Sequence, residues 1–332
     1  MVKANAYGHG LRAVGQRLDG LADALGVASL DEALALRQAG VQTPLLLIEG
    51  VFHPEELTIA AAYGFRVVFH HASQLKWLAQ TFLPKPIEAW VKIDTGMGRL
   101  GFAPEDAAQV LKILAESPSV EGPVTLLSHL ACADEPEHPL NQQQIKVFED
   151  VARGHQGPKS LCNSAGVFAF PEVQQDWVRP GLALYGASPL NGRSAAALGL
   201  KPVMCFHTQL IAVKKLKQGA PLGYGARFIC PEDMPVGIMA VGYGDGYPRQ
   251  ATEQTPVLVE NMEGKRTRCL IAGRVSMDMA AIDLRPCPTA TVGSRVILWG
   301  EALPVEEVAA SMTHSAYDLL TGVQNRVRFE WV

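Results

Sequence analysis

The stretch "IEAWVKIDTGMGRLGFAPEDAAQVLKILAE", residues 87–116, contains the two patterns that decide the fold class. Residues 87–93 are mostly apolar, which is typical of a strand buried on both faces. Residues 104–116 begin with a proline and then place apolar side chains at helical spacing, which predicts a helix. A buried strand followed by a helix is the repeating unit of a parallel sheet covered by helices.

The same unit recurs along the first half of the chain. We expect strands at residues 2–4, 25–29, 44–49, 66–71, 87–93, 124–130, 160–163 and 177–184, and helices at residues 31–38, 54–62, 72–82, 104–116 and 141–153. About eight such units predict a TIM-like (β/α)8 barrel. A doubly wound parallel sheet is the alternative architecture.

The sequence pattern changes after about residue 195. Segments such as "FHTQLIAVKKL" (206–216), "GIMAVGYG" (237–244) and "SRVILWG" (294–300) are separated by Gly, Pro, Asp and Asn turns, which predicts a β-rich second domain. A helical piece is expected near residues 305–312. With residues 190–200 as the linker, the predicted domains are a barrel over 1–190 and a β-rich domain over 200–332.

Bulk properties exclude several classes of protein. The chain has 332 residues and a net charge of −4, with no block of Lys or Arg, which argues against a nucleic-acid partner. No apolar run approaches the length of a membrane span, and no signal peptide is visible. The six cysteines are scattered without a C-x-x-C pair, so we expect reduced thiols in a cytoplasmic protein and no metal site.

The segment "VKANAYGHG", residues 2–10, contains the first candidate for chemistry. Working residues of a barrel lie where strands end, and Lys3 is expected at the end of the first strand. A lysine is ordinarily a solvated surface charge. At a barrel mouth beside apolar neighbours, however, a desolvated amine can attack an aldehyde and form a Schiff base. Tyr7 and His9 are expected within reach of the same mouth.

A second candidate is "WVRPGLALYG", residues 177–186, on the opposite side of the expected mouth. Barrels often bind phosphate at the loops after their last two strands. The backbone N–H groups after Pro180 and the hydroxyl of Ser164 are therefore candidate phosphate ligands. Arg179 is either a ligand contact there or a surface ion pair.

Further motifs carry a family resemblance. They are "KIDTGMGRLGF" (92–102), "SHLACADE" (128–135), "NSAG" (163–166), "DWVRPGLALYGASP" (176–189), "GYGARF" (223–228), "AVGYGDGYPR" (240–249) and "GRVSMDM" (273–279). Together with "VKANAYGHG", the chain closely resembles the alanine racemases. These enzymes use pyridoxal 5'-phosphate (PLP), have fold type III of the PLP enzymes, and join a barrel to a C-terminal β domain. The motifs occur in the family's order and cover nearly the whole chain.

The resemblance implies a role for each matching residue. Lys3 would hold PLP and act as one catalytic base, and Tyr224 would be the base on the opposite face of the substrate Cα. Arg99 and the backbone of Met277 would contact the substrate. The implied cofactor contacts are Tyr7, Ser164, Gly181 and Leu182 at the phosphate, His129 beside the pyridine ring and Arg179 at the pyridine nitrogen. Lys92 matches a position that is carbamylated in some members, where it braces Arg99.

The implied chemistry is coherent. Racemisation needs an electron sink, which PLP provides, and a base on each face of the substrate. An arginine at the pyridine nitrogen leaves that nitrogen unprotonated, which weakens the sink and disfavours transamination. A PLP decarboxylase of the same fold would be expected to place an acidic residue there, so "VRPG" (178–181) argues against that alternative. A PLP-carrier protein of related fold would be a lone barrel, and the second domain argues against it.

The resemblance also implies a homodimer with shared active sites. The β domain of one subunit would complete the barrel mouth of its partner, so that Tyr224 and Met277 would serve Lys3 of the other chain. Residues expected near the substrate entry are Tyr243, Arg249 and Arg274. Asn325 stands where some relatives have a tyrosine that lines the site.

The implied function is the interconversion of L- and D-alanine, for peptidoglycan synthesis or for alanine catabolism. A broad-specificity racemase that also accepts serine is the nearest alternative. Family members have a strand, a helix and the start of the first barrel strand before the lysine. An inactive fragment, less stable than a full-length relative, is therefore the other alternative.

Overall fold

A parallel seven-stranded sheet organises the first unit of the computed structural model, which describes residues 1–332. This unit comprises residues 1–184 and 189–193. Its strands are β1 (Leu25–Val27), β2 (Leu45–Leu47), β3 (Arg66–Phe69), β4 (Ile87–Lys92), β5 (Val120–Leu127), β6 (Lys159–Asn163) and β7 (Trp177–Arg179). Each strand pairs in parallel with its neighbours in the sequence, which confirms the expected barrel in a nearly closed form.

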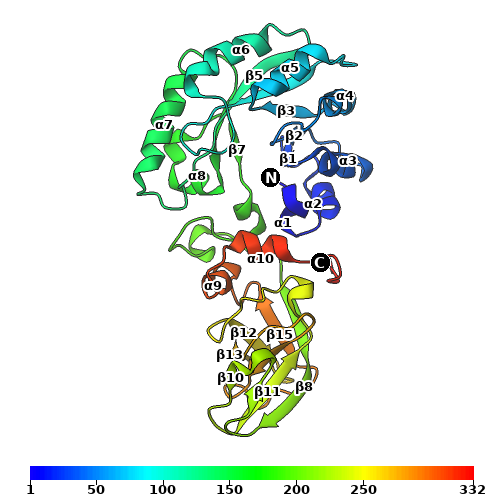
Figure 1. Cartoon of the computed structure of the whole chain (residues 1–332), viewed down its shortest axis with the longest axis vertical. Coiled ribbons are helices and arrows are strands. Elements are labelled where there is room, and N and C mark those ends of the chain that lie inside the picture. Colours follow the sequence, from blue (N-terminus) through cyan, green and yellow to red (C-terminus); the bar gives the residue numbers. More distant parts are fainter. The chain divides into compact units, whose positions relative to one another are not determined.

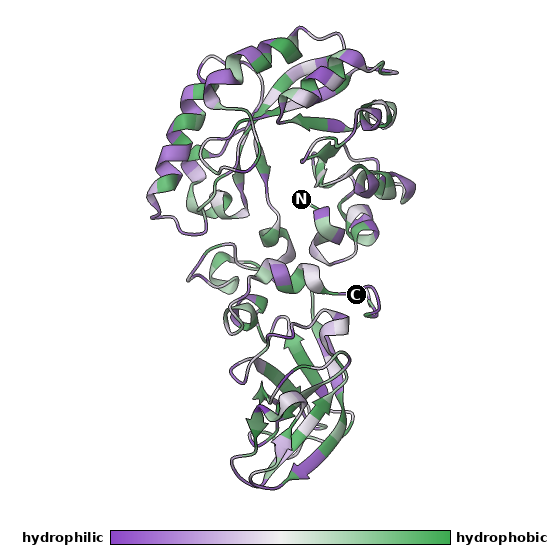
Figure 2. Cartoon of the chain, in the orientation of Figure 1, coloured by the Kyte–Doolittle hydropathy of each residue, from purple (hydrophilic) through white to green (hydrophobic).

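Helices connect the strands and lie along the outer side of the sheet (Figure 1). They are α2 (Leu11–Leu18), α3 (Leu30–Gln38), α4 (Pro54–Tyr63), α5 (Ala72–Gln80), α6 (Ala107–Ala115), α7 (Pro139–Ala152) and α8 (Ser164–Ala169). In Figure 2 the ribbons of α6 and α7 carry both hydrophilic and hydrophobic positions, as expected of helices with one face against the sheet. The sequence did not predict α2 or α8.

Local sequence explains where these elements begin and end. All residues of β1 and β2 are buried, which explains their continuous apolar runs. Ser29 caps α3 by accepting a hydrogen bond from the N–H of Glu32, whose carboxylate in turn accepts from the N–H of Ala28. Pro54 begins α4, and Gly64 ends it in a left-handed conformation with φ of 65°.

The expected strand at residues 2–4 is wrong. Residues 3–7 (α1, Lys3–Tyr7) form a left-handed turn, in which Ala4 to Tyr7 have φ of 52 to 54°. Two hydrogen bonds attach the preceding dipeptide to the sheet: the Val2 N–H donates to Gly26 O at 2.9 Å, and the Met1 amine donates to Pro180 O at 2.8 Å. These bonds place the segment between β1 and the end of β7, where it is too short to form a ladder.

The second unit contains a closed antiparallel barrel with the strand order β11-β14-β13-β12-β15-β8. It comprises residues 185–188 and 194–332. The strands are β8 (Phe206–Leu216), β11 (Met234–Met239), β12 (Pro256–Glu260), β13 (Arg266–Ile271), β14 (Ala280–Asp283) and β15 (Arg295–Trp299). A small hairpin, β9 (Pro221–Leu222) with β10 (Phe228–Ile229), and helices α9 (Val305–Ala310) and α10 (Ala316–Gly322) complete the unit. The expected β-rich second domain is confirmed.

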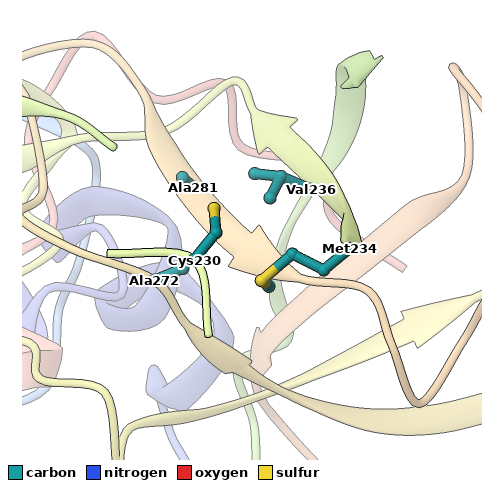
Figure 3. Close-up of a cluster of buried hydrophobic side chains, with 5 residues drawn as sticks. All are labelled: Cys230, Met234, Val236, Ala272 and Ala281. Atoms are coloured by element: carbon teal, nitrogen blue, oxygen red, sulfur yellow. The ribbon is translucent and has the colours of Figure 1, made fainter. Parts of the chain in front are cut away.

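Small apolar side chains fill part of the core of this unit, where Cys230, Met234, Val236, Ala272 and Ala281 form one buried cluster (Figure 3). Cys230 is 1% exposed and packs there as a small apolar residue. All six cysteines of the chain are free. The structure contains no helix with the length and apolar character needed to cross a bilayer, and no group of His, Cys, Asp and Glu that could hold a metal ion.

Candidate functional site

Several basic side chains of the first unit lie at or near the carboxyl ends of the parallel strands. Lys92 ends β4, Arg179 ends β7, and His129 follows β5 by two residues. Lys3 lies in the left-handed turn, and its Nζ is 3.1 Å from Oε1 of Glu49, which follows β2. The structure therefore places Lys3 beside a strand end, as expected, although not on a strand of its own.

Arg179 is buried in a network of neutral acceptors. Its Nη2 donates to Ser128 O at 2.6 Å and to Leu161 O at 3.1 Å, and its Nη1 donates to Ser160 Oγ. The same Nη2 is 3.3 Å from Nδ1 of His129. Burial lowers the pKa of Arg179 to about 10, so the guanidinium keeps its charge at neutral pH. A buried cation without a carboxylate partner is suited to an additional acceptor supplied by a ligand.

His129 is held in its neutral form. Burial lowers the pKa of its imidazole well below the usual value, and the positive charges of Arg179 and Lys92 lower it further. The ring Nε2 is 3.3 Å from Nδ2 of Asn163. A neutral flat ring in this position can pack against an aromatic ligand without adding charge.

The four predicted phosphate ligands lie together. Oγ of Ser164 accepts hydrogen bonds from the N–H groups of Gly181 at 2.7 Å and Ala183 at 3.2 Å. A Cβ atom at Gly181 would lie 2.2 Å from Oη of Tyr7, so only glycine lets the tyrosine reach this backbone. Leu182, between the two N–H groups, is 2% exposed and begins a 3-10 turn. Hydroxyls and turn N–H groups at one place form a cradle that suits a phosphate.

Lys92 is buried with two arginines nearby. Its side chain is 8% exposed, and burial lowers the pKa of its amine to about 8, with further lowering by the charges of Arg99 and Arg179. Arg99 is exposed in the loop after β4. Oδ1 of Asp94 shapes that loop because it accepts the N–H groups of residues 96, 97 and 98.

The titration of Lys92 should make the stability of the chain depend on pH. The folded chain loses this proton near pH 8, whereas the unfolded chain holds it to about 10.5, so the free energy of unfolding should rise between these pH values. Between pH 8 and pH 10.5, the free energy of unfolding should rise by roughly 2 to 3 kcal/mol more in the wild-type chain than in Lys92→Met. Urea unfolding of both chains at pH 8 and pH 10.5, in buffer free of CO₂, measures this difference. An equal change in the free energy of unfolding for the two chains would contradict the prediction.

The remaining predicted residues belong to the second unit and lie on its surface. Tyr224 is 71% exposed and Met277 is 54% exposed. Tyr224 begins a 3-10 turn between two glycines, Gly223 and Gly225, which have φ of 71° and 72°. The loop of Met277 pairs with the loop of Tyr243, since Met277 O accepts from the N–H of residue 244 at 2.8 Å.

Sequence reasoning missed two residues at these loops and strand ends. Arg326 joins the Tyr243 and Met277 loops, because its Nε and Nη2 donate to Asp245 and Asp278 at 2.7 Å each. The signal was an aspartate in each motif and an arginine directly after Asn325, the position where some relatives have a tyrosine. Glu49, the partner of Lys3, was also missed, although a carboxylate directly after a buried apolar run was a signal.

Family models match both parts of the chain. The N-terminal domain model of alanine racemase matches residues 1–189, and the C-terminal domain model matches residues 203–331. The chain belongs to the alanine racemase family. The resemblance stated from the motifs is thereby confirmed across both units.

Individual members of the alanine racemase family are similar to this chain over nearly its whole length. The chain is 48% identical over 327 residues to an alanine racemase of Shewanella sediminis, covering 98% of this chain and 90% of the relative. It is 46% identical over 330 residues to one of Legionella pneumophila, covering 99% and 91%. It is also similar to the crystal structure of biosynthetic alanine racemase from Pseudomonas aeruginosa, with a TM-score of 0.94 and 43% identity, covering 98% of this chain and 89% of that one.

Proposed function

We propose that the chain interconverts L- and D-alanine with PLP as cofactor. The observation that carries this proposal is the arrangement at one end of the first unit, within a chain that matches both domains of the alanine racemase family. A lysine amine, a phosphate cradle and a buried guanidinium with neutral acceptors meet there. These features are the ones that a PLP racemase needs.

The residues of the site fit the cofactor. The hydroxyls of Tyr7 and Ser164 and the N–H groups around Gly181 and Leu182 would hold its phosphate. Arg179 would donate to the pyridine nitrogen and, with its charge retained, would keep that nitrogen unprotonated. When bound, PLP supplies the electron sink that makes the Cα hydrogen of the substrate acidic.

The chain's own groups then bind the substrate and move its proton. Arg99 and the backbone of Met277 bind the substrate carboxylate. Nζ of Lys3 holds or receives the Cα proton on one face, and Oη of Tyr224 does so on the other. A base on each face is required because the proton leaves from one side and returns from the opposite side.

Chirality measurements test the proposed activity. The purified chain with PLP should convert L-alanine to an equal mixture of the two enantiomers, which chiral chromatography resolves. Serine should react roughly 10- to 200-fold more slowly, because one hydroxyl changes binding in an apolar pocket by about 1 to 3 kcal/mol. The absence of D-alanine would contradict the proposal. Equal rates for serine and alanine would favour the broad-specificity alternative.

We propose further that two copies of the chain share their active sites. The high exposure of Tyr224 and Met277 supports this assignment, since a catalytic base that stays in open solvent would be poorly positioned. Loops of one copy would cover the barrel mouth of the other, in a symmetric dimer.

Mixed dimers test the shared site. Chains with Lys3→Ala and chains with Tyr224→Phe should each have at most about 1% of wild-type activity, but co-expression should restore about a quarter of it. Half of randomly formed dimers are mixed, and each mixed dimer has one intact site of two. No restoration, with dimers confirmed by size-exclusion chromatography, would place both bases in a single chain.

Two finer assignments stay predictions. The cations around Lys92 would stabilise a carbamate on its amine, and a pKa of about 8 leaves part of the amine neutral for reaction with CO₂. Six free cysteines are consistent with a reducing compartment, so the cytoplasm stays the predicted location.

A further inference from the structure

We propose that Glu49 is a positioning residue that holds the amine of Lys3 whenever this amine is not covalently engaged. The inference rests on the proposed function only for the use of Lys3 as a reactive amine. It adds a resting position for that amine and a residue that defines this position. No motif in the sequence assigned Glu49 a role.

The contact between the two side chains is direct. Nζ of Lys3 donates to Oε1 of Glu49 at 3.1 Å, and the residues are 46 positions apart in the sequence. The side chains are 36% and 38% exposed, so the pair lies at the open end of the sheet and is only partly screened by solvent. A pair in this setting is stronger than one between fully exposed side chains.

The backbone of Glu49 is fixed on both sides. Its carbonyl accepts a hydrogen bond from Nε2 of His70, which follows β3, at 3.0 Å. The next residue, Gly50, has φ of 73°, and a Cβ atom there would lie 2.4 Å from Val68 O. The carboxylate therefore projects from a rigid turn, whereas Lys3 projects from a left-handed turn with a flexible side chain. Because the long side chain of Lys3 is flexible and the turn of Glu49 is rigid, Glu49 sets where the amine of Lys3 rests.

Glu49 is the carboxylate that pairs with Lys3, and several cations lie nearby. The titratable and charged groups around it are His70, Lys92, Asp94, Arg99, His129 and Arg179. Burial lowers the pKa of both histidines, so they are neutral at neutral pH. Oδ1 of Asp94 accepts three loop N–H groups. Glu49 is thus the acidic side chain that forms an ion pair with Lys3 among several cations.

The pairing has a consequence for reactivity. An ammonium that donates to a carboxylate has no lone pair for attack on a carbonyl carbon, so Lys3 must leave Glu49 and release a proton to solvent before it reacts. After release from a covalent bond, the amine returns to the same place and is held close to the barrel mouth. Glu49 would in this way limit the number of positions that the long lysine side chain samples.

Trace acetylation of the full chain without PLP tests the proposal. The chain is treated briefly with acetic anhydride, and the acetylated fraction of Lys3 is measured by peptide mass spectrometry relative to exposed Lys76. We expect Glu49→Gln to raise the relative labelling of Lys3 about fivefold, because the charge of the carboxylate is lost. Glu49→Asp keeps the charge and should restore most of the protection.

The matched control is a surface pair. Lys112 and Glu116 form a pair with an N–O distance of 3.9 Å, and their side chains are 73% and 68% exposed. Glu116→Gln removes the partner of Lys112 and should change the labelling of Lys112 less than twofold. Unchanged labelling of Lys3 in Glu49→Gln, or an equal rise in Glu49→Asp, would overturn the proposal. Circular dichroism confirms that each variant is folded. Failure of the proposed function is distinguishable, since it would appear as the absence of a borohydride-trapped PLP adduct on wild-type Lys3.

Discussion

Replacement of Lys3 by alanine is expected to lower the racemisation rate by about 10³-fold or more. The change removes the amine proposed to anchor the cofactor and to act as one of the two bases, and a single positioned base contributes about 10²- to 10⁴-fold by itself. Initial rates at saturating PLP, followed by chiral chromatography, measure the loss. Borohydride treatment followed by mass spectrometry should find the adduct on wild-type Lys3 and none on the variant.

The matched control for this change is Lys76→Ala. Lys76 is an exposed lysine on α5, and its removal should leave the rate and the trapped adduct unchanged. A Lys3→Ala chain that retains full racemisation would contradict the assignment of Lys3 as both anchor and base. Trapping of PLP on another lysine would contradict it in the same way.

Tyr224→Phe is expected to lower racemisation by about 10²- to 10⁴-fold, since it removes only the hydroxyl that would serve as the second base. Lys3 stays in place, so one enantiomer of alanine should still exchange its Cα hydrogen with solvent deuterium without inversion. Proton NMR of the Cα signal, combined with chiral chromatography, separates exchange from racemisation. The other enantiomer should exchange far more slowly.

The control for Tyr224 comes from the neighbouring loop. Tyr243 is 40% exposed, and Tyr243→Phe should lower the rate less than tenfold, because its expected place is the substrate entry. If both variants lost the same activity, or if Tyr224→Phe racemised at the wild-type rate, Tyr224 would not be the second base. Loss of exchange for both enantiomers would indicate that Tyr224 acts in binding instead.

The strand and helix order could be predicted from the sequence because local signals agree with the fold. Apolar runs such as residues 45–47 lie between the end of one helix and the start of the next, and the cap at Ser29 lies two residues before the predicted helix start at residue 31. The turn at residues 3–7 could not be predicted, since L-residues adopt it only when tertiary contacts impose it. Helix α8 is short, and its first residue, Ser164, was interpreted as a phosphate ligand and not as a helix start.

The residues of the candidate site could likewise be predicted from the sequence only in part. The motifs identified Lys3 and Arg179, but the partners of Arg179 lie 18 to 51 residues away in the sequence, and no local pattern predicts them. Glu49 was missed because a carboxylate after a strand is usually solvated, and only the folded chain brings it to Lys3. Arg326 was missed for the same reason, since its two aspartates lie on separate loops.

The left-handed turn at the start of the chain has one further consequence. Each L-residue in such a backbone costs roughly 1 to 2 kcal/mol, so the segment keeps its shape only because its neighbours enforce it. Ala6 and Tyr7 are buried, and Oδ1 of Asn5 accepts from the N–H of Leu11 at 2.8 Å. The proposed reactive amine and one proposed phosphate ligand thus share a preorganised segment, so this segment would lose little conformational entropy when a molecule binds to both.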